Sequence, residues 1–215
     1  MLVSSGDLSA DVAGQHRRAI EAAVAAGARR ILYTSQQNAA ADSPYAPAAL
    51  HAATEAALAE SGVAWTALRN GFFGGLDQLL GPWARTDTIA QPADGPIPWT
   101  DRSDLAEAAA VVLAGERTFD GPVTLAAPPA TLDDFASALT EATGHPVERV
   151  VVDDAQWRAD QLAAGVPEVV ADMTLALFKT ARSGYFADPG TLLEELLGRE
   201  PRSITQQIMA QLTMR

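Results

Sequence analysis

The sequence predicts an α/β protein built around a parallel β-sheet, and three observations lead to this fold class. Short apolar segments alternate with longer, Ala-rich helical segments over residues 1–75. The first two of these helical segments each end at a glycine, Gly27 and Gly62, just before the next apolar segment. Each strand-to-strand connection has room for one crossover helix, so the strands are expected to be parallel with right-handed connections.

The first elements follow from apolar spacing and from helix-ending residues. Residues 1–5 are the end of a short apolar strand, and 13–26 have apolar residues at helical spacing before Gly27. A compact apolar strand covers 30–35. Pro47 opens a helix over 47–61, which Gly62 ends, and 63–69 form the third strand.

The later elements are more helical. Residues 76–83 are expected to be helical, 86–98 rich in loops, 104–114 an Ala-rich helix and 122–126 a strand. Thr131, with acidic residues in the first turn, starts a helix that Gly144 stops, and 147–152 form a strand. Four further helices are expected over 154–164, 167–182, 190–197 and 203–212. The composition change at 127–129 predicts two domains, 1–126 with the sheet and a mainly helical lobe over 127–215.

The charge and composition exclude several classes of function. The chain has 27 acidic and 15 basic residues, a net charge of −12, and no cysteine. An acidic surface repels phosphate backbones and anionic lipids, so neither nucleic acid nor a membrane is an expected partner. The absence of cysteine excludes disulfides, thiolate nucleophiles and iron–sulfur clusters. No long apolar run or signal peptide stands out, and a cytoplasmic location is expected.

Several common catalytic motifs are absent. The sequence contains no Gly-x-Gly-x-x-Gly, no phosphate-binding loop ending in Gly-Lys, and no Gly-x-Ser-x-Gly. Its three histidines are far apart and none belongs to a His-Glu-x-x-His motif, so no metal site is predicted. The Tyr-x-x-x-Lys pair of short-chain dehydrogenases is also missing.

Small polar residues follow three expected strands. They are Ser4 and Ser5, then Thr34 and Ser35, and then the loop of residues 70–73. Ligands of parallel sheets bind beyond the carboxyl ends of the strands, so these loops form the predicted site, with aromatic side chains able to cover a flat ring. The alternative is that small polar residues simply end strands here.

His51 is the most promising titratable group. It lies in the first turns of the second helix, at the edge where the strands end, and could act as a proton donor or as a neutral hydrogen-bond partner. The alternative is a partly exposed helix histidine that pairs with Glu55, one turn further on. His16 is expected to pack or to cap, and His145 to be exposed in a turn.

A series of short strings extends over nearly the whole chain: ILYTS at 31–35, HxxTE at 51–55, SGVAWTALRNG at 61–71, RxDLA at 102–106, LA at 125–126, TLxxFA at 131–136, GxPV at 144–147, AAGVP at 163–167 and LLGREP at 196–201. Through these strings the sequence resembles the NmrA-like group of atypical short-chain dehydrogenases/reductases, and especially the type-2 NAD(P)H:quinone oxidoreductases.

The resemblance implies a partial Rossmann-type parallel sheet that binds NADP or NAD, with NADP favoured, and a small α-rich C-terminal lobe. It implies hydride transfer from the nicotinamide to a small-molecule quinone or similar carbonyl substrate. His51 lies where related enzymes place a catalytic lysine. By position, the residues expected to bind the cofactor are Ser4, Ser5, Thr34, Ser35, Asn70, Gly71 and Phe72, and those expected to contact the substrate are Asn38 and Phe73.

The pattern of this family begins roughly seventy residues earlier, with a strand and a Gly-rich loop that holds the pyrophosphate. Without that segment, the chain is expected to bind the dinucleotide more weakly. Its sheet would also have an unpaired edge, which favours a homo-oligomer. The alternative function is that of a non-catalytic NmrA-like protein that senses nucleotides or regulates a partner.

Overall fold

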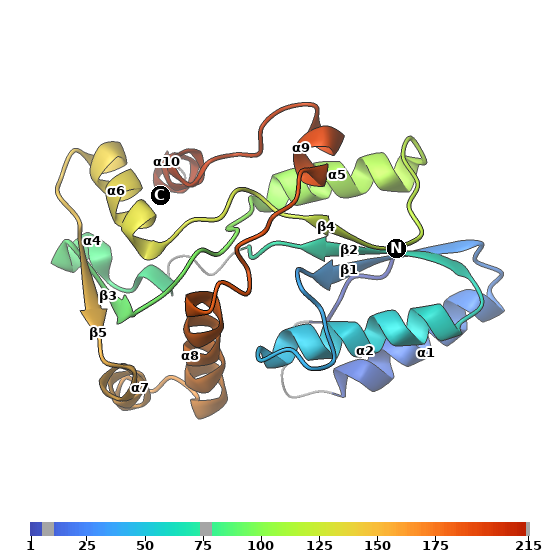
Figure 1. Ribbon diagram of the computed structural model, residues 1–215, viewed down its shortest axis with the longest axis horizontal. Coiled ribbons are helices and arrows are strands. Elements are labelled where there is room, and N and C mark those ends of the chain that lie inside the picture. Colours follow the sequence, from blue (N-terminus) through green and yellow to red (C-terminus); the bar gives the residue numbers. More distant parts are fainter. Residues whose placement is uncertain (6–10, 74–78, 214–215) are drawn as a thin grey trace. The chain divides into compact units, whose positions relative to one another are not determined.

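The computed structural model describes residues 1–5, 11–73 and 79–213 (Figure 1). The chain forms two compact units, each assembled from three segments. The first unit contains Met1–Phe72, Ser103–Ala126 and Gly190–Glu200, and the second contains Phe73–Arg102, Ala127–Pro189 and Pro201–Arg215. The chain passes from the first unit to the second at several points, one of which lies between Ala126 and Ala127. The assignment of separate cofactor and substrate domains stays a prediction.

A parallel sheet forms the centre of the first unit. Its strands are β1 (Arg30–Gln36), β2 (Ala64–Asn70) and β4 (Gly121–Leu125), in the order β1-β2-β4. Leu2 adds a single parallel bridge to β1, because its N–H donates to the Leu32 carbonyl at 2.7 Å and its carbonyl accepts from the Thr34 N–H at 3.1 Å. The predicted parallel α/β class is confirmed.

Helices cover both faces of this sheet (Figure 1). On one face lie α1 (Val12–Ala25) and α2 (Ala46–Glu60), and on the other lie α5 (Arg102–Ala114) and the short α9 (Leu192–Leu197). Alternation along the strands supplies a separate apolar core to each face. The α1/α2 core contains Ile20, Ile31, Tyr33, Leu58 and Ala67. The α5/α9 core contains Leu32, Leu68, Leu105, Ala108, Ala109, Val112, Leu125, Leu193 and Leu196.

The second unit contains a parallel strand pair, of which the sequence predicted one strand, over 147–152, and missed the other. Within the segment expected to be loop-rich, β3 (Thr88–Pro92) pairs in parallel with β5 (Glu148–Val152). The Arg149 guanidinium fixes this pair by donating to the carbonyls of Ile89 at 3.3 Å and Gln91 at 2.9 Å. The helices are α4 (Trp83–Thr86), α6 (Leu132–Thr143), α7 (Asp154–Ala163), α8 (Glu168–Arg182) and α10 (Ile204–Thr213). Part of the helix expected over 76–83 falls outside the described residues.

Local sequence signals explain both ends of α6. The Thr131 hydroxyl accepts from the Asp134 N–H, and the Asp134 carboxylate accepts from the Thr131 N–H at 2.7 Å, while Gly144 ends the helix at a φ of 72°.

Gly95 lies so close to α8 that an added Cβ would be 2.2 Å from the Ala181 carbonyl oxygen. Only glycine fits there without a shift of the backbone.

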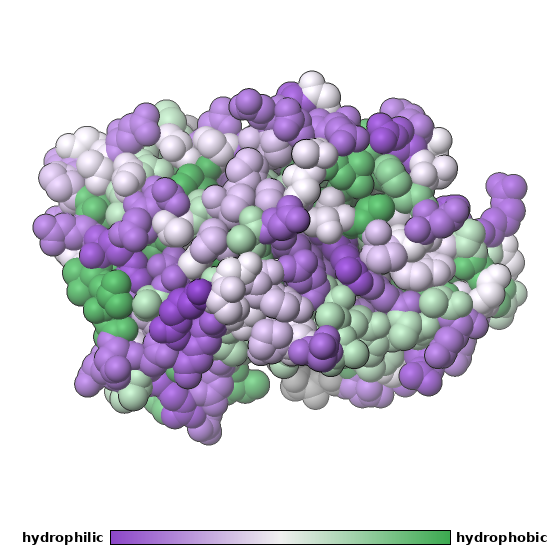
Figure 2. Space-filling model, in the orientation of Figure 1, coloured by the Kyte–Doolittle hydropathy of each residue, from purple (hydrophilic) through white to green (hydrophobic). Residues whose placement is uncertain are grey.

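Hydrophilic residues cover much of the visible face of the molecule, interrupted by smaller apolar areas (Figure 2). In the described part of the chain, no helix is both long and apolar enough to cross a membrane.

Candidate functional site

The carboxyl ends of the strands lie side by side, as the parallel order requires. The Ser4 N–H donates to Thr34 Oγ1 at 2.8 Å. The Asn70 carbonyl accepts from the Gln37 N–H at 2.8 Å, and the Gly71 N–H donates to the Leu125 carbonyl at 2.8 Å. The three predicted loops therefore meet at one edge of the first unit. Their roles in cofactor binding stay predictions.

The side chains near the end of β1 point alternately to the two faces of the sheet. Successive strand side chains point to opposite faces, so Thr34 and Gln36 share the face of Leu32, which belongs to the α5/α9 core. Tyr33 belongs to the core beneath α1 and α2. Ser35 shares that second face, where its hydroxyl donates to Glu55 Oε1 at 2.6 Å.

Glu55 links α2 to two strands. Its Oε1 also accepts from Arg69 Nε at 3.0 Å, and its Oε2 accepts from Arg69 Nη2 at 2.6 Å. The Glu55 side chain is only 8% exposed, against 25% for Arg69. Glu55 is thus paired with Arg69 and Ser35 rather than with His51. The ion pair thus joins the end of β2 to α2, and the Ser35 hydrogen bond joins the end of β1 to the same carboxylate.

His51 lies one turn before Glu55 and is bonded to β1. Its Nδ1 is 2.8 Å from the hydroxyl of the fully buried Tyr33. The pKa of His51 is lowered to about 4, mainly by burial and also by nearby His16, while Glu55 acts in the opposite direction. Burial also raises the pKa of Tyr33 to about 12. At neutral pH, therefore, His51 is uncharged and the Tyr33 hydroxyl keeps its proton.

A second histidine belongs to the same polar network, and the sequence reasoning missed its role. His16 on α1 is 4% exposed, and its Nε2 accepts from the Ser5 N–H at 3.1 Å. Its Nδ1 is 2.9 Å from Thr54 Oγ1. The prediction that His16 packs was correct, since Val12, His16 and Ile20 share the buried face of α1. The four-residue spacing of these positions indicates that His16 faces the core. It does not reveal the bond to Ser5, which joins α1 to a separate segment.

The remaining predicted residues have separate surroundings. Asn38 adopts the left-handed conformation with a φ of 55°, which asparagine tolerates in turns. The Phe72 ring lies 5.9 Å from that of Tyr45, between ring centroids. Phe73 belongs to the second unit and is 46% exposed, with the Arg102 guanidinium carbon 5.4 Å from its ring centroid.

The strand-end edge fits one end of a dinucleotide better than the other. Gln36 Nε2 is buried and has no hydrogen-bond partner among the described residues, and Gln36 pairs in register with Asn70. Such an orphaned donor suits an amide or carbonyl acceptor on a ligand. The first turn of α1, by contrast, is capped by the carboxylate of Asp11, which accepts from the Gly14 N–H at 2.9 Å. A phosphate there would meet a like charge. The edge therefore offers a buried donor to the amide end of a nicotinamide, and the described residues offer no Gly-rich turn for a pyrophosphate.

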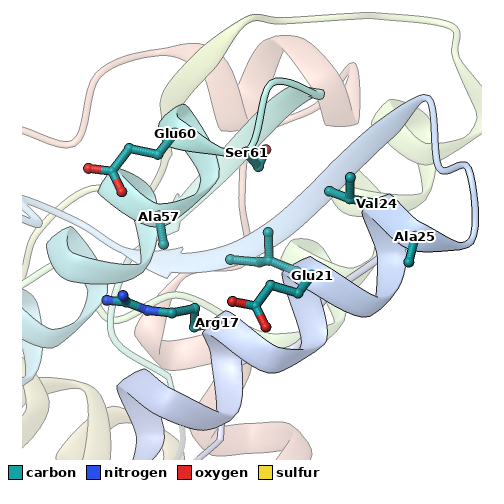
Figure 3. Close-up of a pocket in the computed structure, with 8 residues that line it drawn as sticks. Arg17, Glu21, Val24, Ala25, Ala57, Glu60 and Ser61 are labelled. Atoms are coloured by element: carbon teal, nitrogen blue, oxygen red, sulfur yellow. The ribbon is translucent and has the colours of Figure 1, made fainter.

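A hollow of about 430 Å³ lies between α1 and α2, and Figure 3 shows its lining. Its residues come mainly from the C-terminal halves of the two helices, including Val24 and Ala57, with Arg17, Glu21 and Glu60 around it. Crossover helices run opposite to their strands, so this hollow is far from the carboxyl ends of β1 and β2. Within the described ranges, no cluster of three His, Asp or Glu side chains could hold a metal ion.

Comparison with known proteins identifies the family. No protein-family model matches the chain. The chain is 34% identical over 212 residues to quinone oxidoreductase 2 of Escherichia coli, an alignment that covers 97% of this chain and 73% of that protein. The chain belongs to the NmrA-like family of atypical short-chain dehydrogenases/reductases. Another relative in this family is an NmrA-like oxidoreductase of Aspergillus flavus, 30% identical over 210 residues, with coverage of 92% and 67%.

Solved structures of similar proteins agree with the fold. The NADPH complex of the Escherichia coli NADPH-dependent quinone oxidoreductase has a TM-score of 0.86 at 32% identity and covers 99% of this chain and 75% of that one. Triphenylmethane reductase of Citrobacter sp. with NADP(H) has a TM-score of 0.82 at 26% identity, with coverage of 98% and 74%. NmrA, a negative transcriptional regulator, has a TM-score of 0.70 at 16% identity and shares the fold alone. The predicted resemblance is confirmed.

Proposed function

We propose that the chain is an NAD(P)H-dependent oxidoreductase that transfers hydride to a quinone or a similar carbonyl acceptor. The observation that carries this proposal is the match, over nearly the whole chain, to quinone oxidoreductase 2 and to its NADPH complex. NADP is the favoured cofactor because two related structures hold NADPH or NADP(H). The alignment covers 73% of quinone oxidoreductase 2, which is longer than this chain. The activity of the 215 residues by themselves is therefore part of the proposal.

The cofactor-binding residues in this proposal are those at the strand ends. Ser4, Ser5 and Thr34 would line the loops after the first strand and β1, and Asn70, Gly71 and Phe72 would line the loop after β2. Ser35 would contribute indirectly, because its hydroxyl donates to Glu55 and so helps to hold the end of β1 against α2. When bound, a reduced nicotinamide supplies a hydride. The protein supplies position, exclusion of water and hydrogen-bond donors.

His51 is the proposed catalytic residue. Reduction of a quinone to a hydroquinone takes one hydride and one proton, and negative charge develops on the acceptor oxygen. In this proposal the Tyr33 hydroxyl donates to His51 Nδ1, which places the imidazole proton on Nε2. Because the low pKa keeps His51 neutral, Nε2–H stabilises the developing charge as a hydrogen-bond donor, while the net proton comes from solvent. Asn38 and Phe73 stay the proposed substrate contacts.

The test is NADPH oxidation by the purified chain with a benzoquinone as acceptor. His51→Gln is expected to lower kcat by about 10²-fold, typical of a lost donor at a developing charge. His145→Gln is the matched control, since His145 is exposed in a turn of the second unit, and it should leave kcat unchanged. Phe73→Ala should raise KM for the quinone. Equal rates for the wild type and His51→Gln would remove His51 from the mechanism.

NADPH titration separates the enzyme from the alternative of a sensor. An enzyme binds NADPH and oxidises it when the quinone is added, whereas a nucleotide sensor binds NADPH without turnover. No change in NADPH fluorescence up to millimolar concentration would refute both functions for this chain.

A further inference from the structure

We propose that His16 is a positioning residue, which holds the Ser4–Ser5 backbone in the conformation that the nicotinamide cofactor meets. The effect on cofactor binding rests on the function proposed above, but the effect on the backbone does not. His16 itself is buried beneath the loop and is expected to act through Ser5.

The Ser4–Ser5 segment is fixed by side chains rather than by the sheet. Leu2 is the last residue to exchange backbone hydrogen bonds with β1. Beyond it, the Ser4 N–H donates to Thr34 Oγ1 at 2.8 Å, and the Ser5 N–H donates to His16 Nε2 at 3.1 Å. Two consecutive N–H groups thus have acceptors on β1 and α1, and the backbone of Ser4 and Ser5 is held by both.

The donors determine the tautomer of His16. A backbone N–H can only donate, so Nε2 accepts and is unprotonated. The proton of the neutral ring is therefore on Nδ1, which donates to Thr54 Oγ1 at 2.9 Å. The Thr54 hydroxyl in turn donates to the Leu50 carbonyl at 3.3 Å. The result is one directed chain of hydrogen bonds from the strand end, through α1, to α2.

This arrangement requires His16 to be neutral. An imidazolium would direct a second N–H at the Ser5 N–H, and the contact would become repulsive. Burial lowers the pKa of His16, which preserves the accepting form at neutral pH. The titratable neighbours are Tyr33 on β1, whose ring centroid is 5.6 Å away, and His51 and Glu55 on α2, with Glu55 already paired to Arg69.

The central experiment compares His16→Gln with His16→Leu. The glutamine carbonyl can replace Nε2 as an acceptor and does not titrate, whereas leucine offers the Ser5 N–H no acceptor. We expect His16→Leu to bind NADPH about tenfold more weakly, with KM for a benzoquinone within about twofold of the wild-type value. His16→Gln should stay within about threefold at neutral pH and lose less affinity than the wild type as the pH falls. Wild-type affinity in His16→Leu, or equal losses in both variants, would overturn the proposal.

Amide hydrogen exchange at Ser5 tests the same contact without cofactor. In the wild type and His16→Gln the Ser5 amide should be protected, and in His16→Leu it should exchange about tenfold or more faster. If wild-type NADPH binding fails but this difference appears, the proposed function fails while the positioning of the backbone stands. If His16→Leu does not fold, Thr54→Val removes the acceptor of Nδ1–H and should also speed Ser5 exchange. Unchanged Ser5 exchange in Thr54→Val would then refute the role of His16.

Discussion

Removal of the Glu55 carboxylate should be among the most damaging single changes at the sheet edge. In Glu55→Gln, the ion pair with Arg69 is lost and the bond to Ser35 is weakened. Breaking one partner of a fully buried pair costs about 3–5 kcal/mol. Arg69 is 25% exposed and regains some hydration, so we expect a loss of about 2–3 kcal/mol. For a chain of this size that corresponds to a melting temperature lower by about 5–10 °C.

Urea and thermal unfolding, followed by circular dichroism, would measure this loss. The matched control is Asp120→Asn, which breaks the Arg30–Asp120 pair, whose side chains are 36% and 87% exposed. An exposed pair is worth about 0–1 kcal/mol, so the control should change little. Removal of both partners, in Glu55→Leu with Arg69→Leu, should cost less than Glu55→Leu alone because no charge is left unpaired. The reasoning is refuted if Glu55→Gln and Asp120→Asn destabilise the protein equally.

Three further predictions concern other parts of the molecule. The pKa of His51 falls from 6.5 to about 4 on folding, so the unfolded state binds more protons in this window. Stability should be full above pH 6.5 and fall by at most about 3 kcal/mol as the pH drops towards 4, and urea titrations of His51→Gln should show a smaller fall. Gly95→Ala should lower the melting temperature by several degrees, because the new Cβ overlaps the Ala181 carbonyl, and an unchanged melting curve would contradict this. Thr131→Ala removes a capping box and should cost about 1 kcal/mol in urea unfolding, while Thr131→Ser should recover most of it.

Sequence reasoning predicted the fold best where the determinants are local. The α6 helix was expected over 131–143 and extends over Leu132–Thr143, because Thr131 and Gly144 mark its ends within the segment itself. The β3 strand was missed because Thr88–Pro92 is short and ends in proline. Its partner β5 is far along the chain, and no local signal reports such a pairing.

In the candidate site, too, the features that follow from local sequence were predicted, and those that depend on packing between elements were not. The meeting of the strand ends followed from parallel order. His51 was singled out because the sequence placed it near that edge, and its catalytic role stays a prediction. The bonds from His16 to Ser5 and from Glu55 to Arg69 join separate elements. Side-chain partners of this kind depend on the packing of α1 and α2 against the sheet, which neither spacing nor residue type determines.

The position of α9 has a consequence for how the protein folds during synthesis. Leu193 and Leu196 complete the α5/α9 core, although the strands beneath them end at residue 125. Synthesis must therefore reach residue 196 before this face of the sheet can close. Until then, Leu32, Leu68 and Leu125 lack part of their cover, so the nascent chain is expected to need a holding chaperone over this interval.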